Sequence, residues 1–158
     1  MGAQASILVA TAEVMKALGV RLGQTMRVGD VVALHGQLGS GKTTLAQGLA
    51  TGLGVPPERH VASPTFALVN EHQGKITFVH ADLYRIKHAA ELQELGLEEA
   101  SDRAAVAIEW ADLFPQVLPQ DHLVIALEAH GEARRVSVVG TGARGRALAE
   151  ALLATPGL

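Results

Sequence analysis

The stretch GQLGSGKT, residues 36–43, has the residue types and the spacing of a phosphate-binding loop, G-x-x-x-x-G-K-[ST]. Glycine lets the backbone wrap around phosphate groups with its N–H groups pointing inward, because no Cβ stands in the way. Lys42 can reach the β- and γ-phosphates as a mobile point charge, and the Thr43 hydroxyl is a ligand for Mg²⁺. We therefore expect a nucleotide and Mg²⁺ at the loop and the residue after it: Gly36, Gln37, Leu38, Gly39, Ser40, Gly41, Lys42, Thr43 and Thr44.

The nucleotide is expected to be ATP rather than GTP. Guanine-specific proteins with this loop normally carry a second element, Asn or Thr followed by Lys, any residue and Asp. The sequence has four lysines, Lys16, Lys42, Lys75 and Lys87, and none of them has these neighbours.

Two acidic residues stand where apolar runs end. The run ITFVHAD ends in Asp82, and the run AVAIE ends in Glu109. The carboxyl ends of strands in an open parallel sheet face the ligand crevice, so both acids can reach the same phosphates. Such groups are needed to hold Mg²⁺ and to orient water. The spacing leaves open which acid does which, and the alternative is that each is a solvated residue where a strand meets a loop.

Four further residues each allow two interpretations. Thr65 in SPTF could reach the γ-phosphate in the manner of a switch threonine, or close its own turn. Arg85 in DLYR could supply positive charge to a transition state, although a surface salt bridge is the default expectation. His80 is expected to be a packed residue rather than a base. Trp110 could stack beside the site or belong to the core.

The pattern of apolar residues predicts an α/β fold with a largely parallel central sheet flanked by helices. Together with the phosphate-binding loop, it predicts a fold of the P-loop NTPase type. Thr11 is expected to cap the first helix, which continues to Gly23, and a second helix begins at Lys42. Two hairpins add strands to the sheet, one with its turn at residues 72–75 and one with its turn at residues 129–132. The expected strands are residues 7–10, 31–34, 66–71, 76–80, 104–108, 122–128 and 135–139. The two remaining helices are expected at residues 89–95 and 144–154.

Composition excludes several classes of function. The chain has 158 residues, which fits a single nucleotide-binding domain, residues 1–158. It has no cysteine, which excludes disulfides and thiolate metal sites and suits a cytoplasmic location. The formal net charge of −3 gives no basic footprint for direct binding to DNA. No apolar run approaches the roughly 18 residues that span a membrane.

Four blocks in order, GQLGSGKTTLAQGL, SPTFALVNEH, HADLYRI and AIEWAD, resemble the TsaE (YjeE) family. The family consists of small bacterial P-loop ATPases needed to make N6-threonylcarbamoyladenosine, a modified base beside the anticodon of certain tRNAs. The resemblance runs over about residues 18–119. The loop alone would fit thousands of proteins, whereas its combination with the other three blocks is far more specific.

The resemblance implies a role for each matching residue. Lys42 and Thr43 would bind phosphate and Mg²⁺, and Glu109 would belong to the magnesium site. Asp82 would be needed for hydrolysis, and Thr65 would lie in a switch-like loop.

The resemblance also suggests where the base of the nucleotide binds and where this chain departs from the family. The base would lie near the start of the first helix and the late hairpin, which makes Thr11 and Arg135 candidate contacts. Trp110 matches the tryptophan of the family. Gln37 stands where the family commonly has an acidic residue, and His72 replaces the family's usual aromatic residue, which leaves a stacking role there open.

By this resemblance the protein would act on a partner pair of the TsaB/TsaD type, would meet tRNA only through that pair, and would hydrolyse ATP weakly on its own. The main alternative is a small-molecule or nucleotide kinase. The segment at residues 83–103 has only three Arg or Lys residues, Arg85, Lys87 and Arg103, which are few for the arginine-bearing lid of a kinase. A third possibility is a nucleotide-gated binding module in which hydrolysis is incidental.

Overall fold

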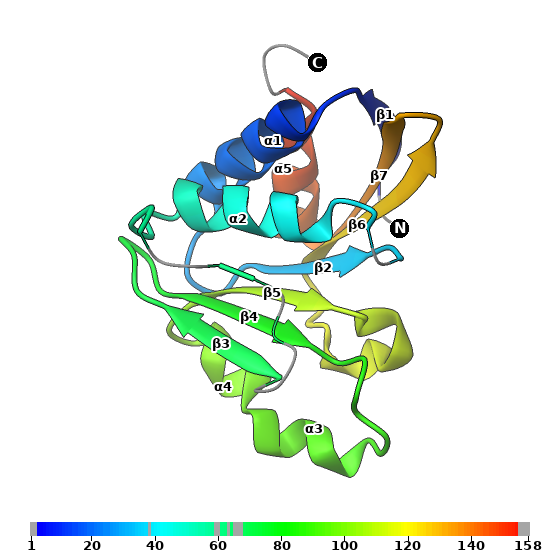
Figure 1. Ribbon diagram of the computed structural model, residues 1–158. Coiled ribbons are helices and arrows are strands. Elements are labelled where there is room, and N and C mark those ends of the chain that lie inside the picture. Colours follow the sequence, from blue (N-terminus) through cyan, green and yellow to red (C-terminus); the bar gives the residue numbers. More distant parts are fainter. Residues whose placement is uncertain (1–2, 38, 59–60, 63, 65–67, 155–158) are drawn as a thin grey trace.

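Seven strands form one sheet with a parallel centre and antiparallel edges. The structure, a computed structural model, describes residues 3–37, 39–58, 61–62, 64 and 68–154. The strand order is β1-β7-β6-β2-β5-β4-β3, in which β6, β2, β5 and β4 are mutually parallel (Figure 1). The strands are β1 (Ala3–Val9), β2 (Val31–His35), β3 (Val69–His72), β4 (Phe78–Asp82), β5 (Ala105–Glu109), β6 (His122–His130) and β7 (Ala133–Thr141). The expected α/β fold with hairpin strands added to a parallel centre is confirmed.

Helices cover both faces of this sheet. On one face lie α1 (Ala12–Thr25), α2 (Lys42–Gly52) and α5 (Gly142–Leu153), and on the other the short helices α3 (Ala90–Leu95) and α4 (Leu97–Ser101) (Figure 1). Two 3₁₀ turns, η1 (Ala111–Leu113) and η2 (Pro115–Val117), follow β5. Among the described residues, no helix has the length and apolar character needed to cross a membrane.

Alternation along β2 divides the core into two parts. Val32 and Leu34 pack toward α1, α2 and α5, whereas Val31 and Ala33 belong to the cluster on the opposite face. All four residues are buried, as the continuous apolar run of a central parallel strand predicts.

Thr11 caps α1 as expected, because its hydroxyl oxygen accepts a hydrogen bond from the backbone N–H of Val14 at 3.2 Å. The helix ends at Thr25, two residues beyond the expected end at Gly23. The first turn of α1 lies close to the loop before α2, because Ala12 and Met15 line one cavity with Gly39 and Gly41.

Helices α1 and α2 are in backbone contact through four glycines. A Cβ built at Gly19 would collide with the carbonyl oxygen of Leu45, and one at Gly48 would collide with that of Lys16. Gly23 and Gly52 make the equivalent approaches one helical turn further on. This glycine seam between the two helices fixes the position of α2, whose first residue is Lys42.

The two hairpins form with changed limits. Strand β3 reaches His72, which was expected in the turn, because His72 pairs with Phe78. The expected start of this strand at Phe66 lies outside the described residues. In the late hairpin, pairing extends to His130 and Ala133, so the turn is two residues rather than four. Gly131 supplies the positive φ (63°) that such a tight turn requires.

Candidate nucleotide-binding site

The phosphate loop follows β2 and closes tightly on itself. The backbone N–H of Ser40 donates to the carbonyl oxygen of Gln37 at 3.0 Å. Gly36 has φ +154°, and a Cβ there would lie 2.5 Å from Ser40 Oγ and 2.8 Å from the carbonyl oxygen of Leu127. Gly41 is the N-cap of α2 in a left-handed conformation, φ +107°. These positions need glycine, as the motif predicts.

The loop leaves a cradle at the start of α2. Ser40 Oγ is buried and has no hydrogen-bond partner within the described part of the chain. Free backbone N–H groups at a helix N-terminus attract anions, and α2 begins at this point. An unsatisfied hydroxyl beside a helix start fits a phosphate group. The described residues contain no cluster of three His, Asp or Glu that could hold a metal alone.

The register of the parallel strands places both acids at the carboxyl ends of neighbouring strands, next to the phosphate loop. Glu109 pairs with Leu34 on one side and with Asp82 on the other. The backbone N–H of Leu83 donates to the carbonyl oxygen of Glu109 at 3.0 Å, which extends this pairing by one residue. The expected convergence of the two acids is observed.

Glu109 is the centre of a buried charged cluster. Its Oε1 lies 3.7 Å from Nζ of Lys42, and its Oε2 lies 2.7 Å from Nε2 of His80. The three side chains are almost inaccessible, with exposed fractions of 2% for Glu109, 7% for Lys42 and 0% for His80. His80 is therefore packed, as expected, but it also contacts the carboxylate that the sequence marks for the metal site.

Asp82 has a different environment from Glu109. Its Oδ1 accepts a hydrogen bond from the backbone N–H of Tyr84 at 2.9 Å. Burial raises the pKa of Asp82, and the negative charge of Glu109 raises it too, against the opposing effects of the Tyr84 hydrogen bond and Lys42. A carboxylate with a raised pKa is a better proton acceptor, so Asp82 is suited to bind and orient water.

Trp110 lies beside Lys42. Its ring centroid is 4.5 Å from Nζ of Lys42 and 4.9 Å from the ring centroid of Tyr84. Trp110 also packs against the core cluster on the α3–α4 face, so both interpretations of this residue hold. Trp110 and Leu68 are the non-glycine residues with positive φ in the described part of the chain, at 61° and 62°. Such strain is concentrated at functional sites.

These side chains surround a cavity of about 640 Å³. Its lining combines the loop, both acids and the segment after β4: Gln37, Gly39, Gly41, Lys42, Thr43, Thr44, Pro64, Leu68, Asp82, Tyr84, Arg85, Glu109 and Trp110. Leu38 and Thr65, which the sequence also marks for this site, lie outside the described residues.

A second cavity of about 210 Å³ adjoins the loop from the other side. It is lined by the start of α1, the loop and the late hairpin: Val9, Ala10, Thr11, Ala12, Met15, Gly39, Gly41, Thr44, Glu132 and Arg134. Thr11 therefore lies where a base contact was expected.

Arg135, by contrast, does not line this cavity. Side chains alternate along β7, and Val136 and Val138 point into the core formed with α1 and α5. Arg134 shares their face, and its Nη2 donates to the carbonyl oxygen of Gly39 at 3.3 Å. Arg135 points to the opposite face of the sheet. Arg134 therefore occupies the position that was expected for Arg135.

Sequence reasoning missed Tyr84, Leu68 and Arg134 as cavity residues. The alternation of Val136 and Val138 contained the signal for Arg134. Tyr84 stands inside the DLYR block and pairs its ring with Trp110, a contact between residues 26 positions apart that no local pattern reveals.

A parallel sheet with a glycine-rich loop between β2 and α2, and with two acids at adjacent strand ends, defines a P-loop NTPase fold. The crystal structure of Bacillus subtilis YdiB is similar to this chain with a TM-score of 0.78 and 30% sequence identity, and the match covers 97% of this chain and 96% of that one. The family model described as threonylcarbamoyl adenosine biosynthesis protein TsaE matches residues 9–137. The chain belongs to the TsaE family.

Relatives from distant bacteria support this membership. The tRNA threonylcarbamoyladenosine biosynthesis protein TsaE of Bacillus subtilis (strain 168) is 37% identical over 143 residues, which are 89% of this chain and 88% of the relative. The proteins with the same name from Streptomyces coelicolor and Mycobacterium tuberculosis (strain H37Rv) are 36% and 39% identical. The matches cover 82% and 74% of this chain, and 93% and 76% of those relatives.

Proposed function

We propose that this protein is a Mg²⁺-dependent ATPase required for the N6-threonylcarbamoyladenosine modification of tRNA in the cytoplasm, and that it acts on a partner complex of the TsaB/TsaD type. The observation that carries the ATP site is the convergence of Lys42, Glu109 and Asp82 at the phosphate loop. Family membership supports the pathway.

Each side chain has a role that follows from its place. The loop N–H groups and Lys42 would bind the β- and γ-phosphates, and Thr43 and Glu109 would hold Mg²⁺. When bound, Mg²⁺ neutralises charge on the phosphate oxygens. Asp82 orients the attacking water and accepts its proton, consistent with its raised pKa.

Lys42 contacts two side chains that it would have to move away from when a nucleotide binds. It lies against the carboxylate of Glu109 and the ring of Trp110. Movement of its ammonium toward phosphate would separate Lys42 from the carboxylate of Glu109, which is proposed to hold the cation. Binding of nucleotide and of Mg²⁺ are therefore expected to be coupled through this pair.

The base is proposed to bind in the smaller cavity, between Thr11 at the start of α1 and Arg134 on β7. In the larger cavity, Arg85 and Tyr84 line the phosphate site from the segment after β4. The protein alone is expected to hydrolyse ATP weakly, because switch-type ATPases can be slow until a partner completes the site.

The deciding experiment measures the nucleosides of tRNA from cells depleted of this protein by mass spectrometry. Loss of N6-threonylcarbamoyladenosine, restored by the intact chain but not by Lys42→Ala, is the expected result. An unchanged nucleoside profile would overturn the assignment to this pathway, and transfer of the γ-phosphate to a small acceptor would then favour the kinase alternative.

A further inference from the structure

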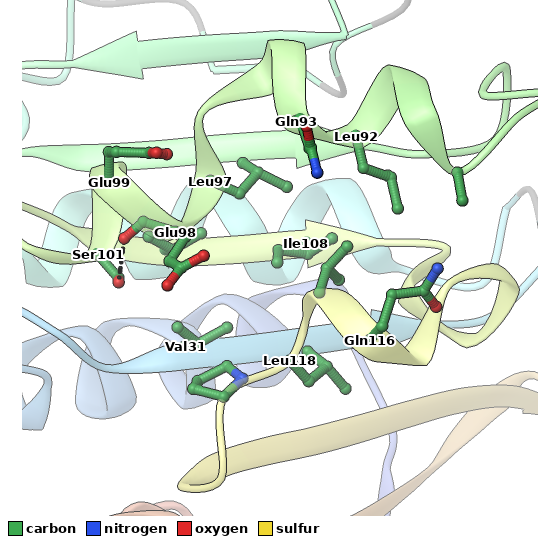
Figure 2. A pocket seen from close by; sticks show the side chains of 14 residues that line it. Val31, Leu92, Gln93, Leu97, Glu98, Glu99, Ser101, Ile108, Gln116 and Leu118 are labelled. Atoms are coloured by element: carbon green, nitrogen blue, oxygen red, sulfur yellow. Dashed lines mark hydrogen bonds between the residues drawn. The ribbon is translucent and has the colours of Figure 1, made fainter.

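A groove of about 870 Å³ crosses the face of the sheet that α1, α2 and α5 leave uncovered (Figure 2). Helices α3 and α4 form one wall, residues 116–119 form the opposite wall, and β2 and β5 form the floor. The groove is separate from both cavities at the phosphate loop, since none of its lining residues belongs to either.

The inner surface of the groove is apolar. Val31 and Ile108 rise from its floor, and both are buried. Leu92, Val117 and Leu118 line the walls and are only half-buried, so they retain apolar surface that an occupant would remove from water.

The rim of the groove at α4 is acidic. Glu98 and Glu99 line it, both are exposed, and no Lys, Arg or His occurs among the described lining residues. The segment at residues 89–102 has acids at Glu91, Glu94 and Asp102 in addition, and the bases that flank it, Lys87, His88 and Arg103, do not line the groove. This field repels phosphate groups of RNA and of anionic membranes, and it attracts a cationic occupant.

The walls also offer hydrogen bonds suited to an extended backbone. Gln93 on α3 and Gln116 on η2 stand on opposite walls, and both side chains are exposed (Figure 2). A primary amide has donors and an acceptor, and therefore pairs with either peptide group of a chain lying between the walls.

The groove is continuous in sequence with the nucleotide site. Ile108 on the floor directly precedes Glu109 on β5, and the wall at residues 116–119 follows Trp110 through η1. An occupant would therefore press on the same strand and turn that carry two side chains of the nucleotide site.

We propose that this groove binds a basic, leucine-containing segment of the protein partner on which the ATPase acts. The inference rests on the proposed function for the existence of such a partner. Lysine or arginine side chains of the segment pair with Glu98 and Glu99, its leucine side chains pack on Leu92, Val117 and Leu118, and its backbone bonds to the two glutamine amides.

The groove itself can be tested without the partner. The probes are a dodecapeptide of alternating lysine and leucine, the same peptide with glutamate for lysine, and a single-stranded RNA dodecamer. Each is titrated into the ¹⁵N-labelled full chain, and amide shifts are followed by NMR. The lysine peptide alone should shift the amides of Leu92, Gln93 and Gln116. Shifts at these amides with the glutamate peptide or RNA, or none with the lysine peptide, would overturn the proposal.

A second measurement uses a purified TsaB/TsaD-type complex and two matched charge reversals. Glu98→Lys with Glu99→Lys alters the groove, and Glu94→Lys with Asp102→Lys alters exposed acids of the same segment outside it. The groove variant should bind the complex at least about tenfold more weakly and lose stimulation of ATP hydrolysis, whereas the control should change affinity less than about threefold. The affinity for ATP, measured by Trp110 fluorescence, should stay unchanged in both variants. An unchanged affinity shows that both variants are folded.

The outcomes separate the two proposals. Equal weakening in both variants, or none in the groove variant, overturns the groove as the docking site while leaving the function intact. If the wild-type chain does not bind the complex but the lysine peptide shifts the groove amides, the proposed partner is wrong and the groove stands.

Discussion

His80 holds one oxygen of Glu109 while Lys42 faces the other. The 2.7 Å contact between His80 Nε2 and Glu109 Oε2 lies in the interior, because both side chains are almost fully inaccessible. Under the proposed function, in which Glu109 holds Mg²⁺, a histidine that fixes the orientation of this carboxylate acts on the metal site without touching the metal. His80 is thus a positioning residue for Glu109.

Replacement of His80 by asparagine should separate hydrolysis from nucleotide binding. The shorter side chain loses the contact with Glu109, so Mg²⁺-dependent hydrolysis should fall by about tenfold to a hundredfold. Affinity for ATP without Mg²⁺ should change less than about threefold, because the loop and Lys42 are untouched. Steady-state hydrolysis as a function of Mg²⁺ concentration checks this.

The matched control for His80 is His72→Asn. His72 stacks on Phe78, as His80 does, with ring centroids 6.0 Å and 5.7 Å apart, but His72 lies at the opposite end of the hairpin from Glu109. An equal loss of hydrolysis in the two variants would show that only packing around Phe78 matters.

Neutralising the two acids should have different effects on stability at pH 7. Glu109→Gln leaves the buried ammonium of Lys42 without its carboxylate, which should destabilise the fold by about 3 kcal/mol. Asp82→Asn should leave the free energy of unfolding unchanged or raise it. Burial raises the pKa of Asp82 above its unfolded value, so above the folded pKa the charged form costs stability, and an amide removes that cost.

Denaturant unfolding of both variants without nucleotide measures this contrast. The amide oxygen that Asp82→Asn introduces would still accept from the N–H of Tyr84, so no hydrogen bond is lost. Both variants should lose hydrolysis. A greater loss of stability in Asp82→Asn than in Glu109→Gln would contradict the assignment of the buried charge cluster to Glu109.

Two adjacent arginines provide a test of the base cavity. Arg134→Ala removes a side chain that lines the cavity and contacts Gly39, so ATP should bind about tenfold more weakly. Arg135→Ala, on the opposite face of β7, should leave the affinity within about twofold. Titration with ATP, read through the single tryptophan, Trp110, compares them. Equal affinities in the two variants would argue against a base in this cavity.

His35 should make stability sensitive to mild acid. Burial lowers the pKa of His35, Asp112 at 3.9 Å raises it in opposition, and Lys42 lowers it further. As the pH falls, the unfolded chain protonates His35 before the folded chain does. The contribution of neutral His35 to the free energy of unfolding is therefore fully present above the unfolded pKa of about 6.5, and it is lost as the pH falls through the folded pKa.

The measurement compares wild type with His35→Gln by denaturant unfolding between about pH 7.5 and pH 5.5. The wild type should lose more stability over this range than the variant, which does not titrate there. Parallel curves for the two proteins would mean that another group causes any loss.

The features that sequence predicts well here are those that short-range rules determine. The spacing of Gly36, Gly41, Lys42 and Thr43 specifies the loop, and the apolar runs ending in Asp82 and Glu109 specify the strand ends. The cap at Thr11 is equally local, because its hydroxyl bonds three residues along the chain. Parallel pairing then brings the two acids together without further information.

Long-range packing determines the rest. The contact between His80 and Glu109 joins residues 29 apart, and it depends on the register of β4 on β5. The alternation of Val136 and Val138 indicates the face of β7 on which Arg134 lies, but its contact with Gly39, 95 residues away, depends on how β7 is placed in the sheet beside β6 and β1. The groove between α3, α4 and residues 116–119 exists only once three separate segments are assembled on the sheet.

The glycine seam between α1 and α2 confines movement to one half of the molecule. Because Gly19 and Gly48 bring the two backbones into contact, neither helix can slide along the other without a collision. The base cavity at the start of α1 and the phosphate loop at the start of α2 therefore shift as one rigid block. Under the proposed function, a structural response to ATP hydrolysis would be absorbed by the segments that follow β4 and β5, which carry Tyr84, Arg85 and Trp110 into the larger cavity.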